Sequence, residues 1–380
     1  MYPTSEVALQ QQTVAEINLS ALRANYRALA AMARPAAMIP PVKAEAYGHG
    51  AVAVARCLAA EGAALFAVVT LNEALELRAA GISQDILVMG VVDPARATEA
   101  VGAGVVITLH SRDHARQAAS AARHSGGRLR CHVKVDTGMG RLGVAADETV
   151  AVFEDLAGSE AVSVEGLMTH LSHAEDEDLA MTEVQLARFR ELVETLRQKR
   201  LCPKMVHAAN SAAVLRCPAG VFTGVRPGFA LYGASPCPEH APSPGLRPIL
   251  TLRSVVALVK EIAPGQGVSY SHTWHAGRRS RIAAIPIGYA DGYCRLLSNR
   301  AQVRVEGRLA PVVGNVCMDT TLVDVTDVPS ARVGSPVTLI EADASSPLSV
   351  HALARLAGTI PHEIMTGLGG RVRRVYVDEQ

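Results

Sequence analysis

Short β-branched runs alternate with Ala-, Leu- and Arg-rich segments of helical period between about residue 19 and residue 233. This alternation is typical of βαβ units, which build a parallel sheet. The expected strands cover residues 38–42, 65–69, 86–89, 105–109, 129–135, 164–169, 204–206 and 224–226. The clearest expected helices cover residues 52–60, 71–80, 147–156 and 183–200. Eight repeats of strand and helix within about 200 to 250 residues predict a closed (β/α)8 barrel of the TIM type.

A different pattern follows Pro236. The stretch from there to Pro248 is rich in proline, which suits an exposed linker. Beyond it, strand-like runs are joined by short turns, apart from one helix candidate at residues 350–357. These strands cover residues 252–259, 281–287, 302–305, 321–325, 336–340 and 373–377. We therefore expect an α/β chain with a barrel domain over residues 14–240, a mainly antiparallel β domain over residues 248–380 and a flexible N-terminus over residues 1–13.

Composition narrows the function classes. Apolar residues make up 49% of the chain and charged residues 19%, so a large core is expected and disorder is not. Lys plus Arg (37) nearly balance Asp plus Glu (36), which disfavours nucleic-acid binding. Seven scattered cysteines are expected to be free thiols in a reducing cytoplasm. Because no secretory signal or membrane-length apolar run is visible, we expect a cytoplasmic protein without a membrane partner.

Polar groups follow several expected strands, which is where barrel enzymes carry their chemistry. Lys43 comes directly after the first strand. Partial burial there would lower its pKa and free an amine that can form a Schiff base with an aldehyde. The alternative is an ordinary surface lysine, since lysine is rarely buried without a partner.

A phosphate site is a second candidate. Ser211 lies at a strand-to-helix turn, and Gly228 and Phe229 follow the eighth strand. A hydroxyl and main-chain N–H groups of this kind suit a phosphate. An ordinary helix cap at Asn210 and Ser211 is the competing explanation.

Histidines near strand ends raise the possibility of a metal site. They are His49, His132, His170 and His207. The first strand ends in lysine and lacks an H-x-H pair, so no metal is expected. His170 could equally be a structural histidine, and Arg141 and Arg226 could pair with core carboxylates.

Taken together, the motifs resemble the alanine racemase family from about residue 14 to residue 377. They are VKAEAYGHG, KVDTGMGRLG, THLSHAED, HAANSAA, VRPGFALYG, GVSYSHTW, IPIGYADGY and VGNVCMDTTLVDV, in family order. The resemblance implies a fold III pyridoxal phosphate enzyme whose barrel is followed by a β domain. It also implies that the enzyme interconverts L- and D-alanine as a homodimer with active sites shared across the interface.

The same resemblance implies two opposed bases. Lys43 would carry the cofactor, and Tyr270 would be the other base, reaching the cofactor from the partner subunit. Two bases make chemical sense because racemisation removes the α-proton from one face and delivers a proton to the other. His170 would bridge towards Tyr270. Arg226 would donate to the pyridine nitrogen and, being always protonated, would suppress transamination and decarboxylation.

Further site residues follow from the motifs. Those implied to bind the cofactor beside the residues just named are Tyr47, Asn210, Ser211, Gly228 and Phe229. The substrate carboxylate would be held by Arg141 and by the main chain at Met318. Lys134 matches a position often carbamylated in the family, where the modified side chain orients the arginine matching Arg141. Tyr289 and Asp319 would support the site.

The chain departs from the family pattern at three positions. Glu45 stands where Asn or Asp is common, Asn315 stands where an arginine is frequent, and Gly370 stands where some members have a bulkier residue. None removes a catalytic group. They bear on the width and charge of the substrate entry, and so on the preference for alanine over serine.

Three alternatives stay open at this point. A non-enzymatic pyridoxal phosphate carrier shares the barrel and its lysine but lacks the second domain. A broad-specificity or serine racemase is often exported, and no signal is visible here. A basic amino acid decarboxylase of the same fold fits the motifs less well. Alanine racemisation could supply D-alanine for peptidoglycan or serve alanine catabolism, because both roles use the same site.

Overall fold

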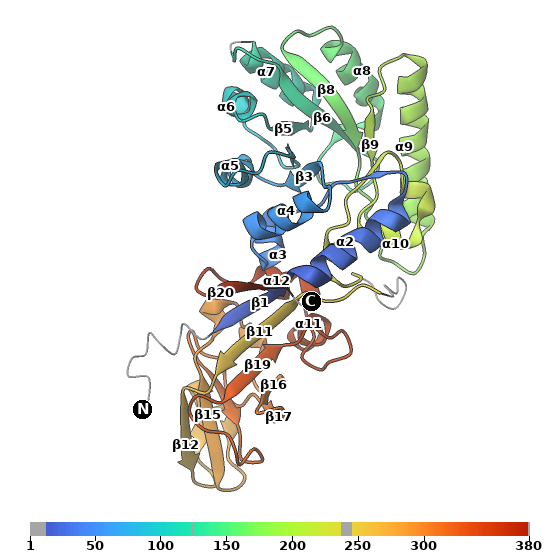
Figure 1. Cartoon of the computed structure of the whole chain (residues 1–380). Coiled ribbons are helices and arrows are strands. Elements are labelled where there is room, and N and C mark those ends of the chain that lie inside the picture. The colour runs from blue at the N-terminus through green and yellow to red at the C-terminus, as the bar shows by residue number, and fades with distance from the viewer. Residues whose placement is uncertain (1–12, 124, 237–244, 379–380) are drawn as a thin grey trace. The chain divides into compact units, whose positions relative to one another are not determined.

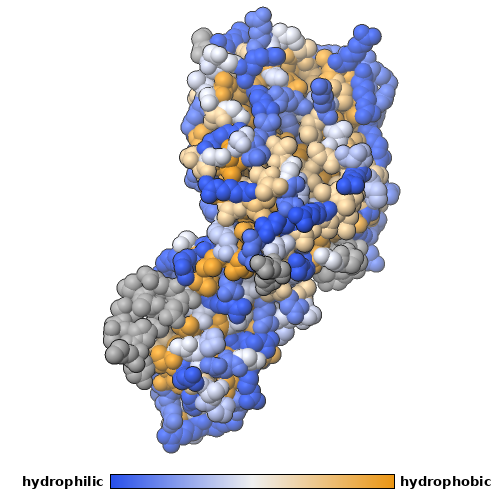
Figure 2. Space-filling model, viewed as in Figure 1, coloured by the Kyte–Doolittle hydropathy of each residue, from blue (hydrophilic) through white to orange (hydrophobic). Residues whose placement is uncertain are grey.

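The chain, seen in a computed structural model, is described for residues 13–123, 125–236 and 245–378. It divides into two compact units. One holds residues 23–46 and 51–246, and the other combines the chain up to Leu22, Tyr47–Gly50 and the chain from Arg247 onward. Hydrophilic residues cover much of the visible face of each unit, with smaller hydrophobic areas between them (Figure 2). Every helix within the described ranges is too short or too polar to span a bilayer.

The first unit contains a near-closed barrel of eight parallel strands, which confirms the predicted fold (Figure 1). Its strands are β2 (Ala37–Met38), β3 (Leu65–Val68), β4 (Asp85–Val88), β5 (Val106–Leu109), β6 (Leu129–Asp136), β8 (Val162–Met168), β9 (Met205–His207) and β10 (Gly224–Val225). They hydrogen-bond in the order β2-β10-β9-β8-β6-β5-β4-β3, and the short β7 (Val144–Ala145) pairs with β6. A bridge between Pro41 and Ala67 joins the two ends of this order.

The first strand is shorter than expected. The sequence predicts a strand over residues 38–42, whereas β2 ends at Met38. Pro40 and Pro41 have no N–H group, so the regular ladder cannot continue through them. The Val42 N–H still donates to the Ala67 carbonyl at 2.8 Å, which keeps this segment against β3 as it leads into Lys43.

Helices of this unit follow the strands, and α5 to α9 lie around the outside of the barrel (Figure 1). The α-helices are α2 (Leu19–Ala33), which begins in the other unit, α3 (Lys43–Gly48), whose last two residues belong to the other unit, α4 (Ala51–Ala60), α5 (Leu71–Ala79), α6 (Ala97–Gly102), α7 (Arg112–Ala122), α8 (Ala146–Leu156), α9 (Ala180–Gln198) and α10 (Ser211–Arg216). Three 3-10 turns, η1 (Pro94–Arg96), η2 (Pro218–Gly220) and η3 (Phe229–Tyr232), complete it. Side chains set several helix starts, as where Ser111 accepts the His114 N–H at 3.0 Å.

The second unit is mainly antiparallel β structure, as predicted. Its described strands are β1 (Val14–Asn18), β11 (Leu250–Val255), β12 (Leu258–Ile262), β13 (Gly267–Val268), β14 (Trp274–His275), β15 (Ser280–Ile285), β16 (Gln302–Val305), β17 (Arg308–Pro311), β18 (Thr321–Asp324), β19 (Pro336–Ile340) and β20 (Arg373–Val377). They form sheets of order β17-β16-β19-β11-β1-β20, β12-β15-β18 and β13-β14. The helical elements are α11 (Val350–Ala357), α12 (Pro361–Thr366), η4 (Tyr270–His272), η5 (Tyr289–Asp291) and η6 (Arg295–Leu297).

Two boundaries expected from the sequence differ from those in the structure of this unit. The range 252–259 was expected as one strand, but β11 ends at Val255 because the Val256 N–H donates to Ser335 while the Ala257 N–H donates to Ala284, in the other sheet. The expected barrel range begins at residue 14, but β1 pairs with β11 and in parallel with β20. Its buried Ala15 and Ile17 therefore belong to the core of the β unit.

The expected flexible N-terminus lies outside the described residues except for Thr13, whose hydroxyl is 2.7 Å from that of Ser254. Of the expected linker, residues 237–244 also lie outside the described ranges.

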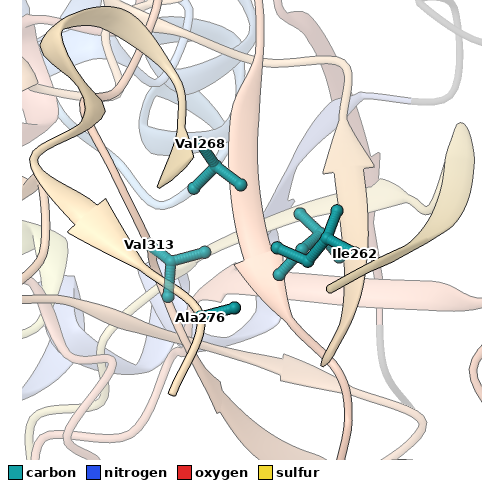
Figure 3. Close-up of a cluster of buried hydrophobic side chains, with 5 residues drawn as sticks. Ile262, Val268, Ala276 and Val313 are labelled. Carbon is teal, nitrogen blue, oxygen red and sulfur yellow. The ribbon is translucent and has the colours of Figure 1, made fainter. Parts of the chain in front are cut away.

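A buried apolar cluster supports the hairpin of β13 and β14. It consists of Ile262, Val268, Ala276, Ile282 and Val313, and these side chains lie together between the surrounding strands (Figure 3). Val268 belongs to β13, and Ala276 directly follows β14. Because η4 lies between those strands, the cluster fixes both arms of the turn that presents Tyr270.

Candidate active site

Lys43 begins a short helical turn of the unusual left-handed sense. The φ angles of Ala44, Glu45, Ala46 and Tyr47 are 48, 55, 51 and 57°, and Gly48 follows at 84°. A left-handed backbone costs roughly 1–2 kcal/mol per ordinary residue, so the surrounding structure must hold it in place. One tie is the Ala51 N–H, which donates to the Glu45 carboxylate at 3.2 Å. Glu45, one of the departures from the family pattern, therefore helps to end this turn at the start of α4.

The surroundings of Lys43 favour a reactive amine. Burial and the nearby positive charges of Arg141 and Arg226 lower the pKa of Lys43, while the carboxylate of Glu73 acts in the opposite direction. A lower pKa leaves more of the amine neutral near physiological pH, which is the form that attacks an aldehyde. The role of Lys43 as a nucleophile stays a prediction, and partial burial beside cations is the environment that such a role requires.

Arg226 begins a chain of buried donors. It is 4% exposed and donates to the carbonyls of Thr169 and Ala208 at 2.6 and 3.1 Å, and to Nδ1 of His207. Burial lowers the pKa of Arg226 to about 10, so the guanidinium stays charged at neutral pH. These three acceptors leave other N–H groups of the guanidinium for a further acceptor.

The donor chain continues from His207 to His132. Since Arg226 can only donate, His207 Nδ1 must accept, and its Nε2 carries the proton towards His132 Nδ1 at 2.9 Å. Burial lowers the pKa of His132 to about 3 and that of His207 well below its ordinary value, so both rings are neutral. Gly166 leaves room for this arrangement, since a Cβ there would lie 2.5 Å from the His132 ring.

The expected phosphate-binding residues lie together in the barrel unit. Asn210 accepts the Ala213 N–H at 3.0 Å and so caps α10, as expected for an ordinary helix cap. Ser211, the first residue of α10, accepts the Ala230 N–H at 3.1 Å. This contact joins the start of α10 to the turn at Gly228 and Phe229 that opens η3. The Ser211 hydroxyl accepts this N–H and can still donate its own hydrogen to a further acceptor such as a phosphate oxygen.

Lys134 and Arg141 lie at the end of β6. Burial, with the charges of Arg141 and Arg226, lowers the pKa of the Lys134 amine to about 8. The loop to Arg141 is shaped by Asp136, whose carboxylate accepts main-chain N–H groups of residues 138, 139 and 140 at 2.8 to 3.2 Å. Arg141 itself is exposed, which leaves its guanidinium accessible to a carboxylate.

His170 is the second residue after β8 and is half-buried. Its main-chain carbonyl accepts a hydrogen bond from the Gln185 amide at 3.1 Å. Burial and the charges of Arg226 and Arg141 lower the pKa of His170 well below its ordinary value. A neutral His170 can donate one ring N–H but carries no positive charge.

The remaining predicted residues belong to the second unit. Tyr270 is 72% exposed and lies in a turn in which its neighbours Ser269, Ser271 and His272 have positive φ angles. Two contacts fix this turn: Ser269 Oγ donates to the Asn315 carbonyl at 2.6 Å, and Asn315 Nδ2 donates to the Tyr270 carbonyl at 2.8 Å.

Met318 is held beside Tyr289 by main-chain hydrogen bonds. The N–H groups of Tyr289 and Ala290 donate to the carbonyls of Cys317 and Met318, both at 3.0 Å. Gly288 permits this approach, since a Cβ there would lie 2.2 Å from the Cys317 carbonyl oxygen. Asp319 pairs with Arg371 at 2.8 Å.

Tyr47 also belongs to the second unit. Its ring centroid lies 6.0 Å from that of His362, and burial raises the pKa of its phenol. The predicted residues therefore form two sets. One, on the barrel unit, contains Lys43, Lys134, Arg141, His170, Asn210, Ser211, Arg226, Gly228 and Phe229; the other contains Tyr47, Tyr270, Tyr289, Met318 and Asp319.

Some contributors were missed at the sequence level. His132 and His207 were considered only as metal ligands, yet the structure joins them to Arg226; among the described residues, no group of three or more His, Cys, Asp or Glu side chains is arranged to hold a metal ion. Glu73 was not singled out, although the capping-box spacing from Thr70 to Glu73 was visible. Gln185 carried no sequence signal, because its contacts with His170 and Ser172 depend on the packing of α9.

The Asn315 contact gives a testable result. Asn315→Ala removes the hydrogen bond to the Tyr270 carbonyl and loosens a turn of strained residues. Since Tyr270 is the expected second base, we expect a roughly 3- to 10-fold lower kcat for alanine racemisation with little change in KM. Steady-state kinetics and thermal unfolding of the variant check this. An unchanged kcat, or a loss that merely follows a lower Tm, would contradict it.

The barrel carries a partly buried lysine beyond its first strand, the arrangement of a barrel enzyme, and comparison with known proteins identifies its family. Residues 17–236 match the alanine racemase N-terminal domain, and residues 249–376 match the alanine racemase C-terminal domain. The chain belongs to the alanine racemase family, and it is an enzyme of that kind.

Individual relatives support the assignment over the whole chain. The alanine racemase of Desulfovibrio desulfuricans is 41% identical over 373 residues, which cover 98% of this chain and 100% of the relative. That of Sorangium cellulosum is 43% identical over 376 residues, covering 96% and 98%. The alanine racemase structure from Streptomyces lavendulae has a TM-score of 0.92 at 36% identity, covering 97% of this chain and 98% of its own. The structure from Bartonella henselae, with covalently bound pyridoxal phosphate, has a TM-score of 0.85 at 31% identity, covering 96% and 99%.

Proposed function

We propose that this chain interconverts L- and D-alanine by a two-base mechanism in which Lys43 and Tyr270 act on opposite faces of the α-carbon. The observation that carries the proposal is the lowered pKa of Lys43 beside Arg226 and Arg141, on a barrel whose family is that of the alanine racemases. The proposal is tested by incubating L-alanine with the purified protein and measuring D-alanine by chiral chromatography.

Pyridoxal phosphate is the proposed cofactor, and the residues present fit it. Lys43 offers an amine for its aldehyde, and Arg226 offers N–H donors beyond its three described hydrogen bonds for the ring nitrogen. Ser211, Gly228 and Phe229 offer donors for its phosphate, with Asn210 fixing the start of α10 and Tyr47 as a further donor. When bound, pyridoxal phosphate supplies the aldehyde and the conjugated ring that make the α-proton of an amino acid acidic.

The protein's own groups then divide the work. Lys43 takes or gives the α-proton on one face, and Tyr270 does so on the other. A neutral His170 donates its N–H towards the Tyr270 phenol. Arg226 stays protonated and, with two neutral histidines behind it, offers the cofactor ring a donor but no readily released proton, which limits side reactions.

Arg141 and the main chain at Met318 bind the substrate carboxylate in this proposal, with Tyr289 and Asp319 as supporting residues. The exposed guanidinium of Arg141 suits a carboxylate because it can make two parallel hydrogen bonds. Since Tyr270 is largely exposed at its turn, we propose that a second copy of the chain completes the site in a homodimer. Sedimentation, together with activity regained by mixing inactive Lys43 and Tyr270 variants, tests the shared site.

We further propose that Lys134 is carbamylated and orients Arg141. The neutral amine is the form that adds carbon dioxide. Because the pKa of Lys134 is about 8, this form predominates above that pH, and its fraction falls about tenfold per pH unit below it. We therefore expect a carbamate signal in ¹³C NMR with labelled bicarbonate that grows as the pH rises through 8. Lys134→Arg should lack the signal, and a wild-type protein without it would contradict the proposal.

A further inference from the structure

Glu73 accepts two more main-chain N–H groups than a capping box needs. In a capping box, the carboxylate three residues into the helix accepts the N–H of the capping residue. Here Glu73 Oε2 accepts the Thr70 N–H at 2.9 Å and the Val69 N–H at 2.8 Å. The other oxygen, Oε1, accepts the Ala44 N–H at 2.7 Å. One carboxylate therefore joins the start of α5 to the residue that follows Lys43.

The position of this contact in the chain is significant. Ala44 is the first residue of the left-handed turn, and its N–H belongs to the peptide group that follows the Lys43 α-carbon. Strained backbone of this kind persists only where the surrounding structure fixes it. The bond to Glu73 fixes that peptide group, and with it the direction in which the Lys43 side chain leaves the main chain.

Glu73 also contributes charge. Arg141, Arg226 and Lys134 present positive charges to Lys43, and Glu73 is the negative charge among the groups that act on it. Removing that charge leaves the amine facing cations only among these groups. The protonated form of the amine would then be less favoured.

We propose that Glu73 is a positioning residue for Lys43, with one carboxylate oxygen capping α5 and the other fixing the peptide group at which the lysine turn begins. The role rests on the proposed function, in which Lys43 carries the cofactor and acts as a base. It adds to that function a residue whose main-chain contact sets the aim of the lysine.

The variants Glu73→Gln and Thr70→Ala separate this role from simple capping. An amide has one acceptor oxygen, so Glu73→Gln cannot accept from both Ala44 and the Val69–Thr70 main chain. Thr70→Ala removes the hydroxyl that accepts the Glu73 N–H at 3.1 Å but leaves the Ala44 contact. Both variants weaken the start of α5, and only Glu73→Gln disturbs Lys43. Glu73→Asp keeps the charge but shortens the reach to Ala44.

Three readouts on the holoenzyme test the proposal. For Glu73→Gln we expect about tenfold lower kcat with little change in KM, a shift of the pH titration of the cofactor absorbance to lower pH, and faster amide hydrogen exchange in the peptide around residues 43–48. For Thr70→Ala we expect a lower Tm with kcat, titration and exchange near wild type. Glu73→Asp should lose kcat but keep the titration.

An equal loss of kcat in Glu73→Gln and Thr70→Ala would overturn the positioning role. Unchanged hydrogen exchange around residue 44 in Glu73→Gln would overturn it as well. Failure of the proposed function is a separate result, because it shows in the wild-type protein as a missing cofactor band. The exchange comparison between the variants keeps its meaning in that case, since it reports on the main chain alone.

Discussion

Replacing Lys43 by alanine is expected to lower alanine racemisation by about 10⁴-fold, because the change removes both the amine that we propose holds the cofactor and one of the two proposed bases. The purified variant should also lack the absorbance band of covalently attached cofactor. Borohydride reduction followed by mass spectrometry should find the cofactor mass on the wild-type peptide that contains Lys43 and on no peptide of the variant. The fold should persist, because Lys43 is only partly buried at the start of a turn held by other contacts.

Lys204→Ala is the matched control, since Lys204 is an exposed lysine of the same unit. It should retain wild-type activity and spectrum. Racemisation by Lys43→Ala at more than a few per cent of the wild-type rate would contradict the assigned role. A reduced adduct on a lysine other than Lys43 in the wild-type protein would do the same.

The second large effect is expected for Tyr270→Phe. Phenylalanine keeps the ring but has no hydroxyl to carry a proton, so racemisation should fall by about 10²- to 10⁴-fold in both directions. The cofactor band should remain, because Lys43 is intact. Proton removal should persist on the face served by Lys43 and be lost on the other face.

Exchange of the α-hydrogen with deuterium oxide measures each face separately. With the variant, one enantiomer of alanine should exchange near the wild-type rate while the other hardly exchanges, as followed by proton NMR of each pure enantiomer. Equal slowing for both enantiomers would instead indicate that Tyr270 shapes the site without acting as a base. Thermal unfolding is expected to be nearly unchanged, since Tyr270 is 72% exposed within its own chain and the substitution keeps the aromatic ring.

The barrel and the β unit could be predicted from periodicity because burial imposes a repeat on the sequence. The sequence predicted the bounds of β20, residues 373–377, and of α11, residues 350–357, as the structure has them. The bounds of two other strands were harder to predict. Two prolines interrupt the hydrogen bonding of the first barrel strand, and the range 252–259 passes from one sheet to another. The partners of β1 were not predictable from a local pattern, because they lie about 240 and 360 residues further along the chain.

In the candidate site, too, some features could be predicted from the sequence and others could not. Lys43, Ser211 and Arg226 could be proposed because each follows a strand, where a barrel places its chemistry. The neutral state of His170 could not be predicted, because it depends on burial and on cations brought close by the fold. The Arg226–His207–His132 chain likewise requires the register of neighbouring strands, in which His132 pairs with Gly166 and Met168 with His207.

In the proposed mechanism two different groups serve the two faces of alanine, and isotope transfer in the wild-type enzyme distinguishes it from a mechanism with one shared base. L-alanine carrying deuterium at the α-carbon is converted in ordinary water, and the D-alanine formed at low conversion is analysed by mass spectrometry. With two bases, the D-alanine should carry hydrogen from the solvent, because the group that removes the deuteron is not the group that delivers the new proton. D-alanine that retains most of the substrate deuterium would show that one group carries the hydrogen across, and would rule out the two-base mechanism.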